Sequence, residues 1–324
     1  MRLEELYPKL STYLPAVQER LAAIAASDLL PLVRAGEQAL GGAAKRYRPA
    51  VVLLCAEACG AAGERVVEYA ALVEAVHSAS LVHDDVVDEA DRRRGVPSLR
   101  ARLGNKMAVL VGDYLVARSL RSAAEDGDLV LMQLLAATAE QMARAQVQEL
   151  LAGGVLLDEP TYLEIISGKT ASLFSCAARV GTLLAAAGPA QQAALARYGW
   201  HVGMAFQLAD DLKDLSLVPQ DPGKPAHRDL ATGKVTLPVI WTLREGEEAL
   251  RHELRELLTG GAGNGETARI VALVAGGGGV QYTVQAAREH IQQAQGCLGD
   301  LPAGPACAAL AALAESLVPA PVPA

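Results

Sequence analysis

Residues 81–95 of this 324-residue chain read Leu-Val-His-Asp-Asp-Val-Val-Asp-Glu-Ala-Asp-Arg-Arg-Arg-Gly. On a helix, Asp84 and Asp88 lie one turn apart and face the same way, while Asp85 points about 100° away from Asp84. An apolar run at residues 70–76 precedes them, so these carboxylates come at the end of a helix that is otherwise typical of a protein core. Because like charges at this spacing repel, we expect a cation to neutralise them.

The same spacing recurs far along the chain, where Asp210, Asp211 and Asp214 follow an apolar stretch at residues 203–209. One acidic cluster alone fits a solvated helix end equally well, but two clusters that each follow an apolar run favour a chemical role. Ligands that are all oxygen suit a hard cation such as Mg²⁺, which keeps several waters and is often shared with substrate phosphates. The two clusters therefore predict a magnesium site.

Composition indicates an all-α protein. Ala, Leu and Val dominate, aromatic residues make up 4% of the chain, and apolar residues recur mostly at spacings of three and four. The 29 basic and 37 acidic residues give a net charge of 29 − 37 = −8 without any basic tract, which argues against nucleic acid as a partner.

Helical periodicity predicts helices at residues 4–24, 28–40, 48–60, 64–89, 104–125, 128–152, 159–187, 189–216, 235–258, 266–276, 279–298 and 304–317. The breaks between them fall at Gly or Pro, and none is a long linker. We therefore expect one helical-bundle domain over residues 1–317 and a loose Pro-rich tail at residues 318–324.

The N-terminus lacks the apolar core of a signal peptide, and no apolar run has the length of a membrane span, so we expect a cytoplasmic protein. The five cysteines are scattered. Cys55 and Cys59 share a helix face and could bind zinc, but no matching Cys or His pair is near, so buried apolar positions suit them better.

Basic residues occur in segments that are not regular helix. Residues 45–49 read Lys-Arg-Tyr-Arg-Pro, and because Pro49 cannot lie in a helix interior, the three cations can converge on an anion. By itself, such a segment is typical of a solvated loop. His77 lies two turns before Asp84 on the same helix face, which favours a site over a chance arrangement.

Arginines at residues 92–94 follow the first cluster, where they fit either structural ion pairs or a diphosphate. Lys169 and Thr170 interrupt an apolar helix, and a Lys there would be unpaired unless it meets an anion. Lys224 and Lys234 lie on a Gly/Pro-rich loop that could fold over a ligand, but the loop lacks the residue order of a nucleotide P-loop.

Two acidic clusters, dispersed Lys and Arg side chains, and small apolar residues describe a site for a diphosphate that carries an apolar tail. Metal ions would neutralise a departing diphosphate, and apolar helix walls would shield the carbocation that remains from water.

These motifs match a known family in order and spacing: the basic segment 45–49, His77, both Asp clusters, the Arg pair, Lys169 with Thr170, and the Gly-Lys loop. The chain resembles the trans-type isoprenyl diphosphate synthases of the polyprenyl synthetase family from about Gly41 to Ala287. The resemblance implies a single-domain all-α bundle around a deep central cavity, the type I isoprenoid synthase fold, usually as a homodimer. It also implies head-to-tail condensation of an allylic diphosphate, such as farnesyl or geranylgeranyl diphosphate, with isopentenyl diphosphate, the released diphosphate taking the proton.

The resemblance also assigns roles to single residues. Two Mg²⁺ ions would be bound by Asp84 and Asp88 with Asp85 in support, and a third by Asp210 with Asp211 and Asp214 around it. The allylic diphosphate would be held by Arg93, Lys169, Thr170, Lys224 and Lys234, with Gln207 positioning that region. Isopentenyl diphosphate would be held by Lys45, Arg48, His77 and Arg94.

Product length would depend on positions about one, two and three turns upstream of Asp84. The four nearest are Ser80, Ala79, Val76 and Ala75, and Leu72 lies beyond them. Short-chain members of the family carry Phe or Tyr at the positions of Ala79 or Ser80, and this chain has no aromatic residue there. The sequence therefore predicts a long-chain product, beyond geranylgeranyl, with a farnesyl or geranylgeranyl diphosphate synthase as the alternative.

Other functions fit less well. A class I terpene cyclase shares the fold, but the second Asp cluster and the isopentenyl-binding cations argue against it. A non-catalytic partner of a heteromeric synthase typically loses one acidic motif, and both are intact here. The catalytic subunit of a heteromer remains an alternative. One departure from the family concerns the two alanines that separate Gly41-Gly42 from Lys45.

Overall fold

The computed structural model describes residues 3–41, 45–93, 95–152, 157–215, 230, 234–260 and 264–317. Its first half contains α1 (Leu3–Leu6), α2 (Leu10–Ala25), α3 (Leu30–Leu40), α4 (Tyr47–Ala58), α5 (Glu64–Val87), the two-residue strands β1 (Arg92–Arg93) and β2 (Val96–Pro97), α6 (Leu99–Leu103), α7 (Asn105–Asp126) and α8 (Leu129–Leu151). The second half contains α9 (Glu159–Ile166), the π-helical turn η1 (Ser167–Ala171), α10 (Ser172–Leu184), α11 (Pro189–Asp214), α13 (Leu237–Glu245), α14 (Glu248–Gly260), α15 (Asn264–Gly276), α16 (Gly279–Gly296) and α17 (Pro305–Glu315). The prediction of an all-α fold is confirmed.

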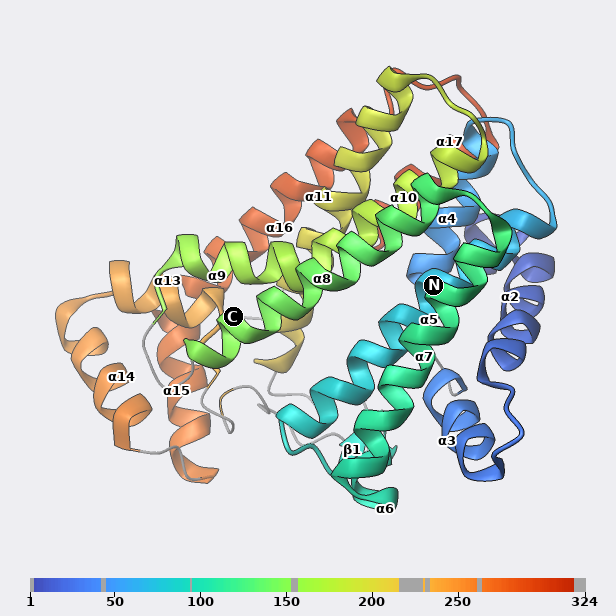
Figure 1. The fold of residues 1–324 in the computed structure, drawn as a ribbon. Coiled ribbons are helices and arrows are strands. Elements are labelled where there is room, and N and C mark those ends of the chain that lie inside the picture. The colour runs from blue at the N-terminus through green and yellow to red at the C-terminus, as the bar shows by residue number, and fades with distance from the viewer. Residues whose placement is uncertain are drawn as a thin grey trace.

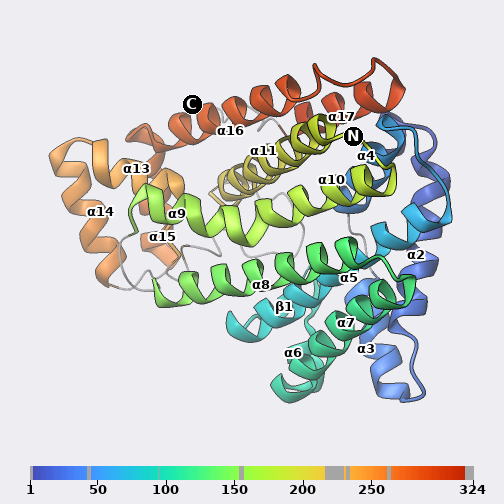
Figure 2. The same cartoon turned by 45° about the horizontal axis from the view of Figure 1, so that its top comes forward.

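Long helices form the body of the molecule, with α2 and α3 at one end and α13, α14 and α15 at the other (Figures 1 and 2). α11 packs between α10 and α16, and α5 packs against α4 and α7. The largest apolar cluster draws on α2, α4, α5, α7, α8, α10, α11 and α17. A second cluster lies among α13 to α16, and a third joins α9, α11, α13 and α16. That the chain forms a single domain stays a prediction.

Several boundaries differ from the predicted ones. The predicted helix at 4–24 is broken before Leu10, because Pro8 has no N–H to continue a helix. The predicted helix at 235–258 is broken at Gly246, where the backbone becomes extended after its N–H bonds the carbonyl of Thr242. The hairpin at 92–97 and the π turn were not predicted, since neither leaves a local periodic pattern.

Some predicted features lie outside the described residues. These are the tail at 318–324, Arg94, and the loop that carries Lys224. Within the described ranges, no single helix has the length and apolar composition to cross a membrane. The helices Glu266–Gly276 and Gly279–Gly296 would pass that test only if taken together across their 64° bend.

α11 lies in backbone contact with α10. A Cβ at Gly199 would lie 2.4 Å from the carbonyl oxygen of Phe174, and a Cβ at Gly203 would lie 2.5 Å from the Cα of Ala171. No side chain larger than hydrogen fits at either position unless the helices separate. This contact fixes the wall of the bundle that carries the second Asp cluster.

We expect Gly199→Ala to lower the free energy of unfolding by about 1–3 kcal/mol, because the added methyl overpacks a backbone contact. Urea denaturation followed by circular dichroism would measure the loss. Gly296→Ala is the matched control, because its Cβ would meet nothing within 4 Å. Helix propensity alone favours Ala over Gly, so an equal change in both variants would show that close packing at Gly199 does not set the cost.

Two histidines link α11 to α16. Nδ1 of His201 lies 3.0 Å from Nδ1 of His290, and the ring of Trp200 packs against both. Burial lowers the pKa of both histidines, and the positive charge of neighbouring Arg197 lowers the pKa of His201 further. For His290 the pKa falls to about 4, with His201 lowering it further and Glu289 opposing the change. The folded protein therefore favours the neutral pair.

The unfolded chain takes up protons at these histidines near their usual pKa of about 6.5, before the folded protein does. We therefore expect the stability of the fold to be lost progressively as the pH falls from about 6.5 towards 4. Thermal unfolding across this range measures the effect. His290→Gln should flatten this part of the profile, and an unchanged slope in that variant would assign the pH dependence to other groups.

Candidate active site

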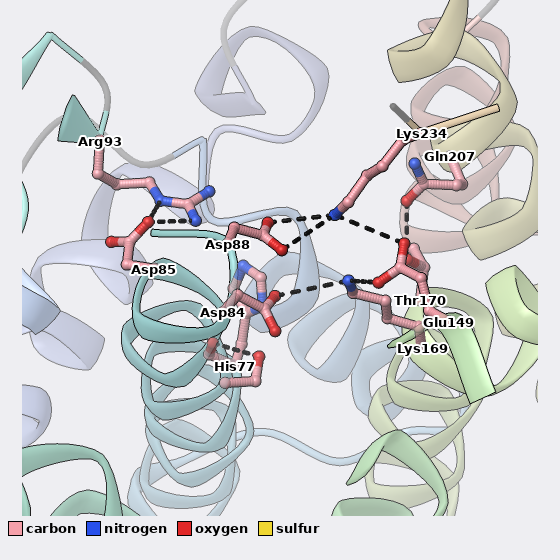
Figure 3. Close-up of polar contacts among 11 residues, drawn as sticks. His77, Asp84, Asp85, Asp88, Arg93, Glu149, Lys169, Thr170, Gln207 and Lys234 are labelled. Carbon is pink, nitrogen blue, oxygen red and sulfur yellow. Dashed lines mark hydrogen bonds and ion pairs between the residues drawn. The ribbon is translucent and has the colours of Figure 1, made fainter. Parts of the chain in front are cut away.

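The first Asp cluster lies at the C-terminal end of α5. Asp88 caps the helix, with its N–H 2.8 Å from the carbonyl of Asp84, and the chain then turns back through the β1–β2 hairpin. This turn brings Arg93 onto Asp85, with nitrogen–oxygen distances of 2.9 and 2.6 Å. Asp85 is buried and held by Arg93, whereas Asp84 and Asp88 point across to the facing wall (Figure 3).

Two lysines approach these carboxylates from the other side. Nζ of Lys169 lies 3.9 Å from Asp84 and also pairs with Glu149 of α8. Nζ of Lys234 lies 3.1 Å from Asp88 and 3.6 Å from Glu149. Two ammonium groups therefore bridge carboxylates on opposite walls (Figure 3).

Burial disfavours the ionised form of Asp84. Burial raises the pKa of the Asp84 carboxyl, and the positive charges of Lys169 and Arg93 oppose that rise while Asp88 and Glu149 add to it. The carbonyl end of α5 contributes further negative potential at the same place. The cations beside Asp84 therefore favour the ionised form of its carboxyl.

The π turn η1 places Lys169. A Cβ at Gly168 would lie 2.7 Å from the Cβ of Ala145, so η1 and α8 are in close contact. Glu149 lies one turn after Ala145 on α8 and therefore faces the same way. The extra residue of the π turn and the absence of a side chain at position 168 together bring Lys169 within reach of Glu149.

The second cluster divides into a buried and an exposed part. Asp211 is 2% exposed and accepts hydrogen bonds from the hydroxyl of Tyr162 and from Nε2 of Gln207, the latter at 2.9 Å. Oε1 of Gln207 in turn accepts from Thr170 at 2.8 Å. The side chain of Asp210, by contrast, is 60% exposed. Asp211 thus links α11 to α9, and Gln207 links it to η1, while Asp210 is open to a ligand.

The three cations of the basic segment at residues 45–49 do not all have the same surroundings. Nη1 of Arg48 donates to Nε2 of His77 at 3.1 Å, which brings these two predicted site residues together, and Lys45 is exposed. Arg46, however, pairs with Glu74 and is 10% exposed. The expectation that all three cations converge on an anion is therefore wrong for Arg46, because a buried carboxylate neutralises it.

The four positions expected to set product length all lie on α5. Ala75 and Ala79 are fully buried and Val76 is 3% exposed. Ser80 is half-buried and donates to the carbonyl of His77 at 2.8 Å. Their role stays a prediction.

Glu149 is the site residue that the sequence interpretation did not assign. It is visible in the sequence as a charged side chain in an apolar helix, but its partners Lys169 and Lys234 are 20 and 85 residues away. Only the packing of η1 on α8 shows that Glu149 faces the first Asp cluster.

The donor set suits a hard divalent cation. Asp84, Asp88 and Glu149 supply carboxylate oxygens, which are the ligands that such a cation prefers. Among the described residues, no three acidic, His or Cys side chains lie close enough to hold an ion by themselves. These residues therefore fit Mg²⁺ that completes its coordination with water and phosphate oxygens, as Mg²⁺ commonly does.

Comparisons with known proteins agree on one family. The model of the family described as polyprenyl synthetase matches residues 31–274. An octaprenyl diphosphate synthase of Haemophilus influenzae is 33% identical over 93% of this chain and 92% of its own length. Component 2 of a heptaprenyl diphosphate synthase from Geobacillus stearothermophilus is 40% identical over 76% of this chain and 77% of its own.

Other relatives make shorter products or are known in three dimensions. A (2E,6E)-farnesyl diphosphate synthase of Mycobacterium bovis is 38% identical over 77% of this chain and 72% of its own. The crystal structure of a polyprenyl synthase from Caulobacter crescentus, complexed with calcium and isoprenyl diphosphate, superposes with a TM-score of 0.92 at 30% identity. That match covers 98% of this chain and 97% of the other.

We expect Mg²⁺ and inorganic diphosphate together to raise the unfolding temperature more than either alone, because the ion links the carboxylates to the anion. At one hundred times the dissociation constant, the gain in free energy of unfolding would be about 2.7 kcal/mol. Asp84→Asn should remove most of this shift. Asp91→Asn is the control, because Asp91 is exposed and paired with Arg100. Equal shifts in both variants would place the ion elsewhere.

Proposed function

The chain belongs to the polyprenyl synthetase family and is a prenyltransferase, and on this premise we propose that it condenses an allylic diphosphate with isopentenyl diphosphate to make a long-chain trans-polyprenyl diphosphate. The observation that carries the proposal is the bridge of Lys169 and Lys234 between carboxylates of opposite walls. Carboxylates and cations already lie in contact at this site. A diphosphate that carries metal ions can bind both, through its metal ions to the carboxylates and through its oxygens to the lysines.

Allylic diphosphate is the substrate proposed for this bridge. When bound, Mg²⁺ would be held by Asp84, Asp88 and Asp210, and would neutralise the charge that develops on the departing diphosphate. Lys169 and Lys234 would exchange part of their carboxylate contacts for phosphate oxygens. Asp85 would keep Arg93 oriented towards the same anion. Asp214 and Lys224 are proposed for this region, and Arg94 for the isopentenyl diphosphate region, from the family resemblance alone.

Isopentenyl diphosphate is proposed to bind Arg48, His77 and Lys45. The Arg48 guanidinium lies over the rings of Phe174 and Phe206, at 4.5 and 5.7 Å from their centres. These rings present apolar, water-excluding surface beside the cations. A carbocation formed nearby would be shielded from water, and the isopentenyl double bond could attack it. Proton loss to the released diphosphate would complete the step without a side-chain base.

Product analysis tests this function directly. The purified chain would be incubated with isopentenyl diphosphate, farnesyl diphosphate and Mg²⁺, and the dephosphorylated products sized by chromatography. Products well beyond geranylgeraniol support the proposal. Condensation that stops at geranylgeraniol would keep the chemistry but reject the long chain, and no condensation would point to a missing partner or another reaction.

Chain length should respond to the bulk of residues on α5 upstream of Asp84. We expect Ala79→Tyr to shorten the product, because a phenol ring there would block the proposed path of the growing chain. Ala79 is fully buried, so Ser80→Phe, at a half-buried position, is the second variant if the first does not fold. Product size in a folded variant is the measurement, and an unchanged distribution in both would reject this path.

A homodimer is also proposed. Most of the exposed large apolar side chains among the described residues lie on α7 and α8: Val109, Leu110, Leu129, Val130, Val147, Leu150 and Leu151. Such residues are typical of surfaces that another chain covers. The Geobacillus relative is named as one component of its enzyme, so a heteromer is the alternative. Light scattering on the purified chain distinguishes a dimer from a monomer that needs another subunit.

A cytoplasmic location stays a prediction.

A further inference from the structure

Arg46 is bound to three other segments of the fold. Its guanidinium lies 2.7 Å from Glu74 of α5 through Nη1 and 2.6 Å from Gln18 of α2 through Nη2. Nη2 also donates to the carbonyl of Leu40, the last residue of α3. Only a planar group with several fixed donors can reach all of these acceptors at once. Arg46 therefore fixes the start of α4 relative to α2, α3 and α5.

The backbone at Arg46 is strained as well. Its φ of 53° lies in the left-handed region, which is unfavourable for a residue with a Cβ. The side-chain bonds hold the chain in this conformation. Because the backbone turns at Arg46, the direction of Lys45 before it and of Arg48 after it both depend on this one residue.

Glu74 connects the same contact to the other half of the proposed isopentenyl site. It is 3% exposed and lies three residues before His77 on α5, so the two side chains are neighbours on the helix. Arg46 and Glu74 thus tie the basic segment to the turn of α5 that carries His77. Arg48 and His77 follow Arg46 and Glu74 on the same two segments, and they are in contact at 3.1 Å.

We propose that Arg46 and Glu74 are positioning residues for isopentenyl diphosphate, holding Lys45 and Arg48 opposite His77. The inference rests on the proposed function, because it takes these three residues as the isopentenyl subsite. A buried ion pair is a poor source of stability, since desolvation offsets most of its attraction. It does fix the direction of the groups that it joins, and here those groups adjoin substrate-binding cations.

The experiment compares Arg46→Lys and Glu74→Gln with the unaltered chain. Lys keeps the charge but cannot reach Glu74, Gln18 and Leu40 together, and Gln keeps the volume of Glu74 while removing its charge. We expect KM for isopentenyl diphosphate to rise about tenfold in each, with KM for the allylic diphosphate changed less than about twofold. Calorimetry with isopentenyl diphosphate alone gives its affinity without turnover and should show the same loss.

Arg65→Lys is the matched control. Arg65 lies on α5, near its other end, and binds Asp126 and Asp128 through the same kind of forked contact, at 2.7 and 2.9 Å. We expect this variant to be less stable in thermal unfolding but to keep both KM values, because its contact adjoins no proposed substrate group.

The outcomes separate the inference from the function that it rests on. If the unaltered chain condenses the substrates but Arg46→Lys changes both KM values equally, or Arg65→Lys raises KM for isopentenyl diphosphate as much, the pair is merely structural and the inference fails. If the unaltered chain neither condenses the substrates nor binds isopentenyl diphosphate, the proposed function fails and the inference with it. If Arg46→Lys does not fold, Glu74→Gln decides between these outcomes.

Discussion

Negative charge at the C-terminal end of α5 has to be neutralised from the facing wall of the bundle, and much of the structure serves that requirement. Burial raises the cost of charge on Asp84, and the nearby charges of Asp88 and Glu149 raise it further. Lys169 meets this requirement only because η1 packs closely on α8, and Lys234 only because its segment crosses to the end of α5. The ion pairs of the site therefore depend directly on how the helices pack.

The basic side chains of the two proposed subsites have different contact partners. On the allylic side, Arg93, Lys169 and Lys234 contact four carboxylates, those of Asp84, Asp85, Asp88 and Glu149, so these groups leave a net negative charge before any ligand arrives. On the isopentenyl side, Arg48 lies against a histidine and two phenyl rings, none of which carries a full negative charge at neutral pH. The first side therefore needs metal ions before it can accept a diphosphate.

Local pattern was sufficient for the all-α fold and for placing both Asp clusters at helix ends, because helix periodicity and the spacing of carboxylates are properties of neighbouring residues. It was not sufficient for pairings across the fold. Arg46 belongs to a basic segment in the sequence but meets Glu74, 28 residues away. Asp210 and Asp211 are adjacent in one motif, yet one is exposed and the other buried against Tyr162. Such differences depend on which helix packs on which face, and spacing along one helix carries no information about that.

The π turn makes the site depend on the number of residues in η1 as well as on their identity. In a regular helix, each residue advances the direction of the side chains by about 100°, so one residue fewer between α9 and α10 would rotate one helix relative to the other by that angle. Tyr162 on α9 would then turn away from Asp211, although no atom of either had been changed. A deletion or an insertion in this segment would therefore disturb the site even if every other side chain were kept. Its length acts as an element of the active site in its own right.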